Sequence, residues 1–342
     1  MLTYSCAAMR IFRLSALGAL GGLLIGTPQF AVSQDSAPTE KVEKNNKRGA
    51  AARLGYHFKV GETTRYRVVG FFDGRIPPFV QPAGPPAHLR LTLDYAVKPE
   101  QLTADGAEVS FTVEKAEILI LQNAVGLDNK MPPSDQQIEF PVPLDQIQTA
   151  LNVKATLKSD GTVVKVVGGD ANSQKINLGI ELRKLFLLLL PVAFPDNAVK
   201  IGDQWNFSDG LLGKSAGKTT YTASLTSFQA KKSDTIFQCS ETASAVFDER
   251  LDKAGRPGAA IADAVDTSQG NASLTGDFSF SAPTRPDKKT NRSAGRLQEG
   301  HYTLNAVLDR KRALPDPGNP DAPLDTHVDV SARLTVQTLQ KK

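Results

Sequence analysis

Apolar and polar side chains alternate along most of the chain after residue 54. The clearest runs are 88–97, 108–114, 151–157, 302–308 and 328–336. A period of two gives a strand one apolar face and one polar face, which is typical of an antiparallel sheet with one face in the core. Asp105-Gly106 and Asp160-Gly161 follow such runs and are typical hairpin turns. The pattern therefore predicts a mainly β protein built on a large antiparallel sheet.

One segment has a helical period instead. Four leucines between 176 and 190 are spaced four, three and four residues apart, which places them in a single stripe of an α-helix: Leu178, Leu182, Leu185 and Leu189. Asn172 or Ser173 can cap the start of this helix, and Pro191 ends it. We therefore predict one helix lying across the sheet.

The last turn of this predicted helix, residues 185–190, is apolar on every side. Such a turn either packs within the core or covers an apolar cleft. Leu187 lies near the side of the helix opposite the leucine stripe, between Arg183 and Lys184 around the helix. If the helix covers a cleft, the residues that we predict to face a ligand are Phe186, Leu187 and Leu190.

The first 33 residues predict an export signal. Arg10 and Arg13 precede an apolar run over 14–26, and Ala31-Val32-Ser33 fits a cleavage site of small residues. This run is shorter than the roughly 20 apolar residues that a membrane span requires. A start at Met9 rather than Met1 leaves the pattern intact. We therefore expect a periplasmic or extracellular protein without a transmembrane anchor in its mature chain.

The rest of the chain divides by composition. Residues 34–53 are polar, charged and small, which predicts a disordered linker. Residues 54–342 are expected to form one β-rich domain, either undivided or made of two halves joined near 191–200. Four stretches rich in glycine, proline and charge are predicted as long loops: 73–87, 248–270, 285–300 and 311–325.

The formal net charge of +4 arises within the first 53 residues, since basic and acidic residues are equal in number after them. Partners such as nucleic acids and anionic membranes select proteins with an excess of basic residues on the binding surface. The balanced charge of the β-rich part argues against both as the main partner.

Two short segments resemble each other. Val60-Gly61-Glu62 and Ile201-Gly202-Asp203 each place an apolar residue, a glycine and an acid before a strand. Glycine permits a turn conformation there, and the acid can accept a hydrogen bond from the turn backbone.

With the runs 157–166 and 190–205, this arrangement resembles an uncharacterised family of bacterial secreted proteins and lipoproteins. The resemblance covers roughly residues 55–339. It implies an open half-barrel like that of periplasmic lipoprotein carriers, a curved antiparallel sheet with a helix across its concave face. Many members of that family carry a lipidation cysteine after the signal, and this chain does not; nor does the family supply catalytic residues.

Candidate chemistry is sparse. Cys239 shares the apolar face of a predicted strand, so we expect a buried, unreactive thiol. Glu241 lies on the same face, which indicates a bulge, a change of register or a buried partner. The run 213–219 resembles a phosphate-binding loop but has three residues between its glycines rather than four.

We predict no catalytic residues, no cofactor and no metal site. The four histidines have no zinc-ligand spacing, and the sequence places no acid–base pair together: His57, His88, His301 and His327. Two functions from different classes remain. The first is a non-enzymatic binding protein for an apolar small molecule, a lipid or a lipidated peptide. The second is a structural or protein-interaction domain of the cell envelope with a filled core.

Overall fold

The computed structural model describes residues 51–75, 87–121, 137–139, 143–169, 182–208, 210–212, 219–231, 233–251, 266–284, 292–311 and 325–339. The predicted signal at 1–33, most of the linker at 34–53, the start of the predicted helix and residues 213–218 of the glycine-lysine run lie outside the described residues.

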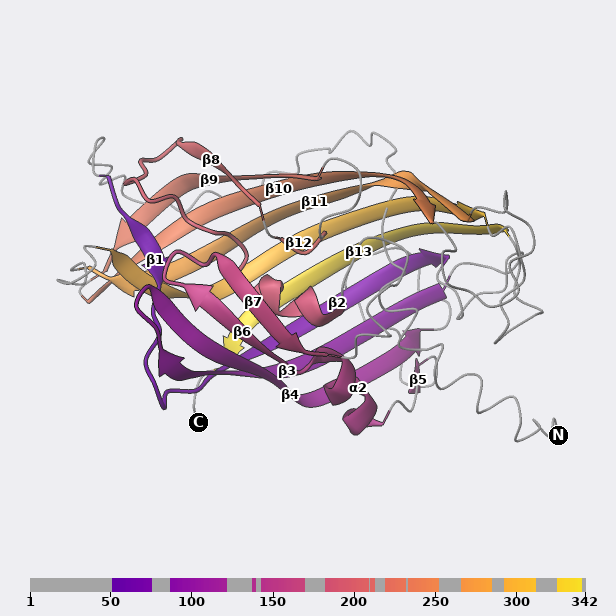
Figure 1. The fold of residues 1–342 in the computed structure, drawn as a ribbon, viewed down its shortest axis with the longest axis horizontal. Helices are drawn as coiled ribbons and strands as arrows, with labels where there is room; N and C mark the ends of the chain where they lie inside the picture. The colour runs from indigo at the N-terminus through magenta and orange to yellow at the C-terminus, as the bar shows by residue number, and fades with distance from the viewer. Residues whose placement is uncertain are drawn as a thin grey trace, which may run out of the picture.

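The described chain forms a 13-stranded, mainly antiparallel sheet that remains open, as predicted (Figure 1). Its strands are β1 (Leu54–Tyr56), β2 (Thr64–Arg75), β3 (Ala87–Leu102), β4 (Gly106–Leu121), β5 (Gln137–Glu139), β6 (Val153–Lys158), β7 (Val163–Gly168), β8 (Gln204–Phe207), β9 (Thr219–Ala230), β10 (Asp234–Leu251), β11 (Asp266–Pro283), β12 (Ser293–Lys311) and β13 (Asp325–Leu339). Two short helices accompany them, α2 (Leu144–Leu151) and η2 (Leu182–Leu189).

The strand order is β7-β6-β4-β3-β2-β13-β12-β11-β10-β9-β8, with β5 beside β4 and β1 parallel to β12. Strands from the first part of the chain lie on one side of the sheet and strands from the second part on the other, and they meet where β2 pairs with β13. The edge strands β7 and β8 are consecutive in sequence but lie at opposite edges of the sheet. The described part of the connection between them packs over the sheet, with Phe186 against Phe111 of β4 and Phe194 against Phe280 of β11.

One face of the sheet, which we call the inner face, carries the core. The alternation read from the sequence is present here, because positions such as Leu89 to Tyr95 and Tyr302 to Leu308 are buried at every second residue. One row of paired inner-face positions crosses the sheet: Ala223, Glu241, Gly276, Tyr302, Leu334, Gly70, Leu91 and Ile118. Two of these positions are glycines, and one is an acid.

Parts of the predicted loops are strand. β12 includes residues 293–300, the ends of β10 and β11 extend into 248–270, and β2 extends into 73–87 as far as Arg75. The glycines of these stretches indicated loops, but Gly300 is an inner-face position against which the Tyr302 ring packs, as it also packs against Gly276 of β11. A glycine within a strand often marks a site where another group approaches the backbone closely.

The two similar sequence segments form similar turns. Gly61 has a φ of 81° and Gly202 a φ of 91°, in the left-handed region that favours glycine. The backbone N–H of Lys200 donates to Asp203 Oδ2 over 2.8 Å, as expected for an acid that closes a turn. Glu62 differs, because it accepts instead from Arg296 Nη1 over 2.8 Å.

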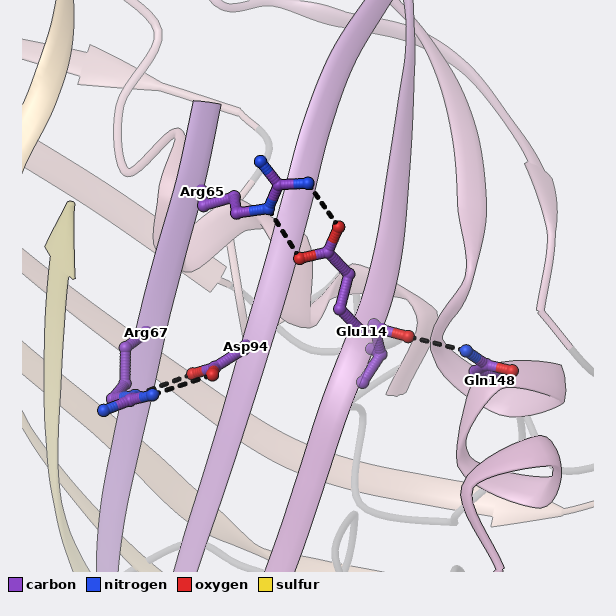
Figure 2. A network of polar contacts seen from close by, with 6 residues as sticks. Arg65, Arg67, Asp94, Glu114 and Gln148 are labelled. Carbon is purple, nitrogen blue, oxygen red and sulfur yellow. Dashed lines mark hydrogen bonds and ion pairs between the residues drawn. The ribbon is translucent and has the colours of Figure 1, made fainter. Parts of the chain in front are cut away.

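The opposite, outer face is polar and carries paired charges (Figure 2). Arg65 donates to both carboxylate oxygens of Glu114 over 2.7 and 2.9 Å, and Arg67 donates to Asp94 over 2.7 and 2.8 Å. Gln148 of α2 donates to the carbonyl of Val113 over 2.7 Å, which holds this helix against β4. Arg67 and Asp94 are paired on the neighbouring strands β2 and β3, and such a pair stabilises the register modestly. Arg65 and Glu114 lie on β2 and β4, so their ion pair spans β3.

Arg292 is a buried cation at the start of β12. Its Nη1 donates to the Leu54 carbonyl over 2.7 Å, and its Nη2 donates to Asp196 Oδ1 over 2.6 Å. It therefore joins β1, β12 and the connection between β7 and β8.

We expect Arg292→Met to lower the free energy of unfolding by about 1–3 kcal/mol, because it leaves the Leu54 carbonyl without its charged donor. Arg65→Met is the matched control, since it removes an arginine from a solvent-exposed pair and should change stability little. Urea denaturation of both variants tests this. Equal losses would show that the buried contacts of Arg292 contribute no more than a surface pair.

Candidate functional site

Residues 182–194, which we call the cover segment, belong to the connection that crosses the inner face. The segment begins with η2, a 3₁₀-helix and not the α-helix predicted from the leucine spacing. A 3₁₀-helix has three residues per turn, so side chains three apart are eclipsed. Leu185 and Leu188 therefore share one side of η2, and the stripe that linked Leu185 to Leu189 is absent.

Polar contacts hold the far end of the cover segment. Tyr56 Oη donates to the Val192 carbonyl over 2.9 Å, and Trp205 Nε1 donates to the Ala193 carbonyl over 2.9 Å. The Phe194 ring packs against Tyr56, Phe280 and Trp205. Residues 192–194 thus form an anchor, separated from η2 by Leu190 and Pro191.

A small cavity lies between η2 and the inner face, with a volume of about 30 Å³. Ten side chains line it, and they are almost entirely apolar: Val68, Phe72, Leu91, Leu93, Tyr95, Leu185, Leu188, Leu211, Leu304 and Leu334. The floor comes from β2, β3, β12 and β13, so the cavity lies over the join between the two groups of strands. It could hold about two water molecules and is far smaller than a typical ligand pocket.

The predicted ligand-facing residues lie elsewhere on the cover segment. Phe186 packs on Phe111, with ring centroids 4.6 Å apart. Leu187 is only 4% exposed, so it does not lie on an open edge of the helix, and Leu190 is also buried. None of the three is among the described residues that line the cavity; Leu185 and Leu188 are. A three-residue period in 182–190 was the signal that could have identified them.

Tyr95 supplies a polar group to the cavity wall. Its ring is buried, and its hydroxyl has no hydrogen-bond partner among the described residues. Burial raises the pKa of this phenol, so the group is a neutral hydroxyl that can donate or accept one bond.

A second buried polar group lies on β10. Glu241 is 3% exposed on the apolar inner face, and its Oε2 has no hydrogen-bond partner among the described residues. Burial raises the pKa of this carboxyl to about 8, so it is protonated at neutral pH. The sequence marked Glu241 as anomalous and offered a bulge or a change of register as a reason. The register of β10 with β11 is unbroken there, whereas its pairing with β9 shifts between Gln238 and Cys239, shortly before Glu241. Glu241 is a core acid beside this shift.

Cys239 is buried two residues before Glu241, as predicted. Burial raises the pKa of its thiol to about 12, so almost none of it is thiolate at neutral pH.

The remaining candidate chemistry stays dispersed in the described part of the chain. His88 lies 3.0 Å from Asp73, His327 2.7 Å from Asp309 and His301 3.2 Å from Glu299, each beside a different acid. Within the described ranges, no three metal-ligating side chains come together. The helices described there are also too short or too polar to span a membrane.

The raised pKa of Glu241 predicts a specific pH dependence. Between its ordinary pKa of 4.5 and its folded pKa of about 8, the folded state keeps a proton that the unfolded state has lost. The resulting stability is fully present below pH 4.5 and is lost as the pH rises to about 8. The nearby acids Tyr56, Tyr302 and Cys239 have raised pKa values and stay neutral in this window.

We expect the free energy of unfolding to fall by on the order of a few kcal/mol across this window, as measured by urea denaturation. Glu241→Gln should remove that part of the slope. Asp277→Asn, which removes an exposed carboxyl from the neighbouring strand, should retain it. A slope unchanged in Glu241→Gln would contradict the assignment.

By sequence, the chain matches no model of a known protein family and no curated protein. Among solved structures, it is similar to lipovitellin in a structure described by its lipid–protein interactions, with 11% identity over 83% of this chain and a TM-score of 0.44. The chain spans 26% of that lipovitellin chain. It also has 8% identity to OmpT, an in-vitro folded outer membrane protein of Vibrio cholerae, over 82% of this chain and 100% of that one, with a TM-score of 0.20. Similarities this low leave the function to be inferred from the geometry of this chain.

Proposed function

We propose that this protein is an exported, non-enzymatic binding protein that holds an apolar ligand, such as an acyl chain, between the inner face and η2. The observation that carries the proposal is the cavity over the join of β2 and β13, with a floor of sheet side chains and a roof that includes Leu185 and Leu188. The ligand enlarges this cavity by displacing η2 from the sheet.

The construction of the cover segment supports such a movement. Its anchor at 192–194 is held by hydrogen bonds and stacked rings, whereas η2 contacts the sheet through apolar side chains such as Phe186 on Phe111. Apolar contacts are not directional, so an acyl chain can replace those of η2 on the same surface. The 3₁₀ geometry also gives η2 weaker internal hydrogen bonds than an α-helix has.

The second candidate function is a structural or protein-interaction domain with a filled core. The burial of all residues from Phe186 to Leu190 favours it, because these side chains already fill space that a ligand would use. The two candidates differ in whether η2 can be displaced, and this difference can be measured.

The neutral dye N-phenyl-1-naphthylamine, whose fluorescence rises in apolar sites, tests the proposal on the purified protein. We expect saturable binding, and we expect Leu188→Ala to tighten it several-fold by enlarging the cavity. The same substitution should lower stability by about 2–5 kcal/mol.

Leu189→Ala is the matched control. Leu189 belongs to the same segment and is equally buried, but it is not among the described residues that line the cavity. It should lose comparable stability without tighter dye binding. Equal gains in both variants would show that the dye reports loosening of the core, and the absence of saturable binding to the wild type would favour the filled-core domain.

A further inference from the structure

Glu241 and Tyr302 are buried polar groups that an apolar ligand alone leaves unexplained. Glu241 Oε2 and Tyr302 Oη are fully enclosed, and neither has a hydrogen-bond partner among the described residues. Leaving such a group unmatched costs about 1–3 kcal/mol. Buried polar groups are matched in most proteins, so two unmatched groups in one place indicate a partner that joins them.

The register brings these two groups together. Glu241 on β10 pairs with Gly276 on β11, and Gly276 pairs with Tyr302 on β12. Gly276 has no side chain to separate them, and the Tyr302 ring packs against its Cα. The other positions next to Glu241 on the inner face carry small side chains, Ala223, Cys239 and Ala243.

The electrostatics of this place select a positive partner. Burial is the main cause of the raised pKa of Tyr302, and Glu241, Tyr56 and Cys239, which become negative when they ionise, raise it further. Burial alone raises the pKa of Glu241, without an opposing cation from the described residues. An ammonium group would stabilise the ionised form of Glu241 and can donate up to three hydrogen bonds, whereas a carboxylate would oppose that ionisation and could meet only the neutral acid.

The place adjoins residues that line the cavity. Tyr302 pairs with Leu334 and lies two residues before Leu304, and both leucines line the cavity. From β12 to β10 there are two interstrand spacings, or about 10 Å. Tyr56, whose hydroxyl binds the Val192 carbonyl of the cover segment, is coupled electrostatically to the same acids.

We propose that Glu241 and Tyr302 bind the ammonium group of a long-chain amine whose tail lies in the cavity beneath η2. This rests on the proposed function, because the tail requires the apolar site. The ammonium donates hydrogen bonds to Glu241 Oε2 and Tyr302 Oη. Glu241 releases its carboxyl proton to solvent as the ion pair forms, so charge is conserved.

Three ligands with the same tail test the proposal: dodecylamine, dodecanol and dodecanoate, each below its aggregation concentration and in competition with N-phenyl-1-naphthylamine. We expect dodecylamine to displace the dye from the wild type at a concentration at least tenfold lower than dodecanoate. Glu241→Gln should abolish this preference and Tyr302→Phe should reduce it. Asp277→Asn, the matched removal of an exposed acid, should keep it.

A measurement on the wild type tests the ammonium site even if the variants fail to fold. Calorimetric titration with dodecylamine near pH 7, in two buffers of different ionisation enthalpy, should show release of about one proton per bound amine. A purely structural role for Glu241, with the amine bound as its ammonium ion, predicts no release.

The outcomes separate the two proposals. Equal displacement by all three ligands, or a preference for dodecanoate, would overturn the ammonium site and leave the apolar binding function in place; water matching the two groups would give this result. If the dye does not bind and none of the ligands produces a binding heat, both proposals fail together.

Discussion

The path of the chain from β7 to β8 is the constraint on which the rest of the structure depends. These strands follow each other in sequence but form opposite edges of the sheet, and the described part of their connection passes over the sheet between Phe111 and Phe280. The inner face is apolar, and a segment crossing it must itself be apolar to avoid burying unmatched polar groups. The leucine-rich run at 185–190 is therefore a consequence of the topology as much as of any ligand.

The same constraint explains where the cavity lies. A single narrow segment cannot pack closely against every side chain of a wide sheet. The space that is left unfilled is the cavity over the join of β2 and β13. The structure thus combines a core that is nearly filled with a roof of one short helix. Whether such an arrangement is a binding site depends on the energy of lifting η2, which is set by apolar packing near Phe111 and Leu334.

The sequence predicted the sheet well, because alternation is a local property of each strand. It also predicted the glycine turns at Gly61 and Gly202, whose backbone requirement is local too. It failed for η2, since the choice between three and 3.6 residues per turn depends on the surface beneath. The sequence also could not show which residues lie beside Glu241, because Gly276 and Tyr302 are brought next to it only by the pairing of β10, β11 and β12.

The pairing of β2 with β13 also bears on how the protein folds. The earliest of the long strands and the latest described strand lie side by side in the middle of the sheet, while the strands at its edges come from the middle of the chain. Pairings between residues so distant in sequence form slowly, because the entropy of closing a long loop is lost before the new contacts add stability. Two half-sheets with exposed apolar faces are therefore expected to exist before the central seam forms, and a chain interrupted before β13 would retain both halves without the contact that unites them.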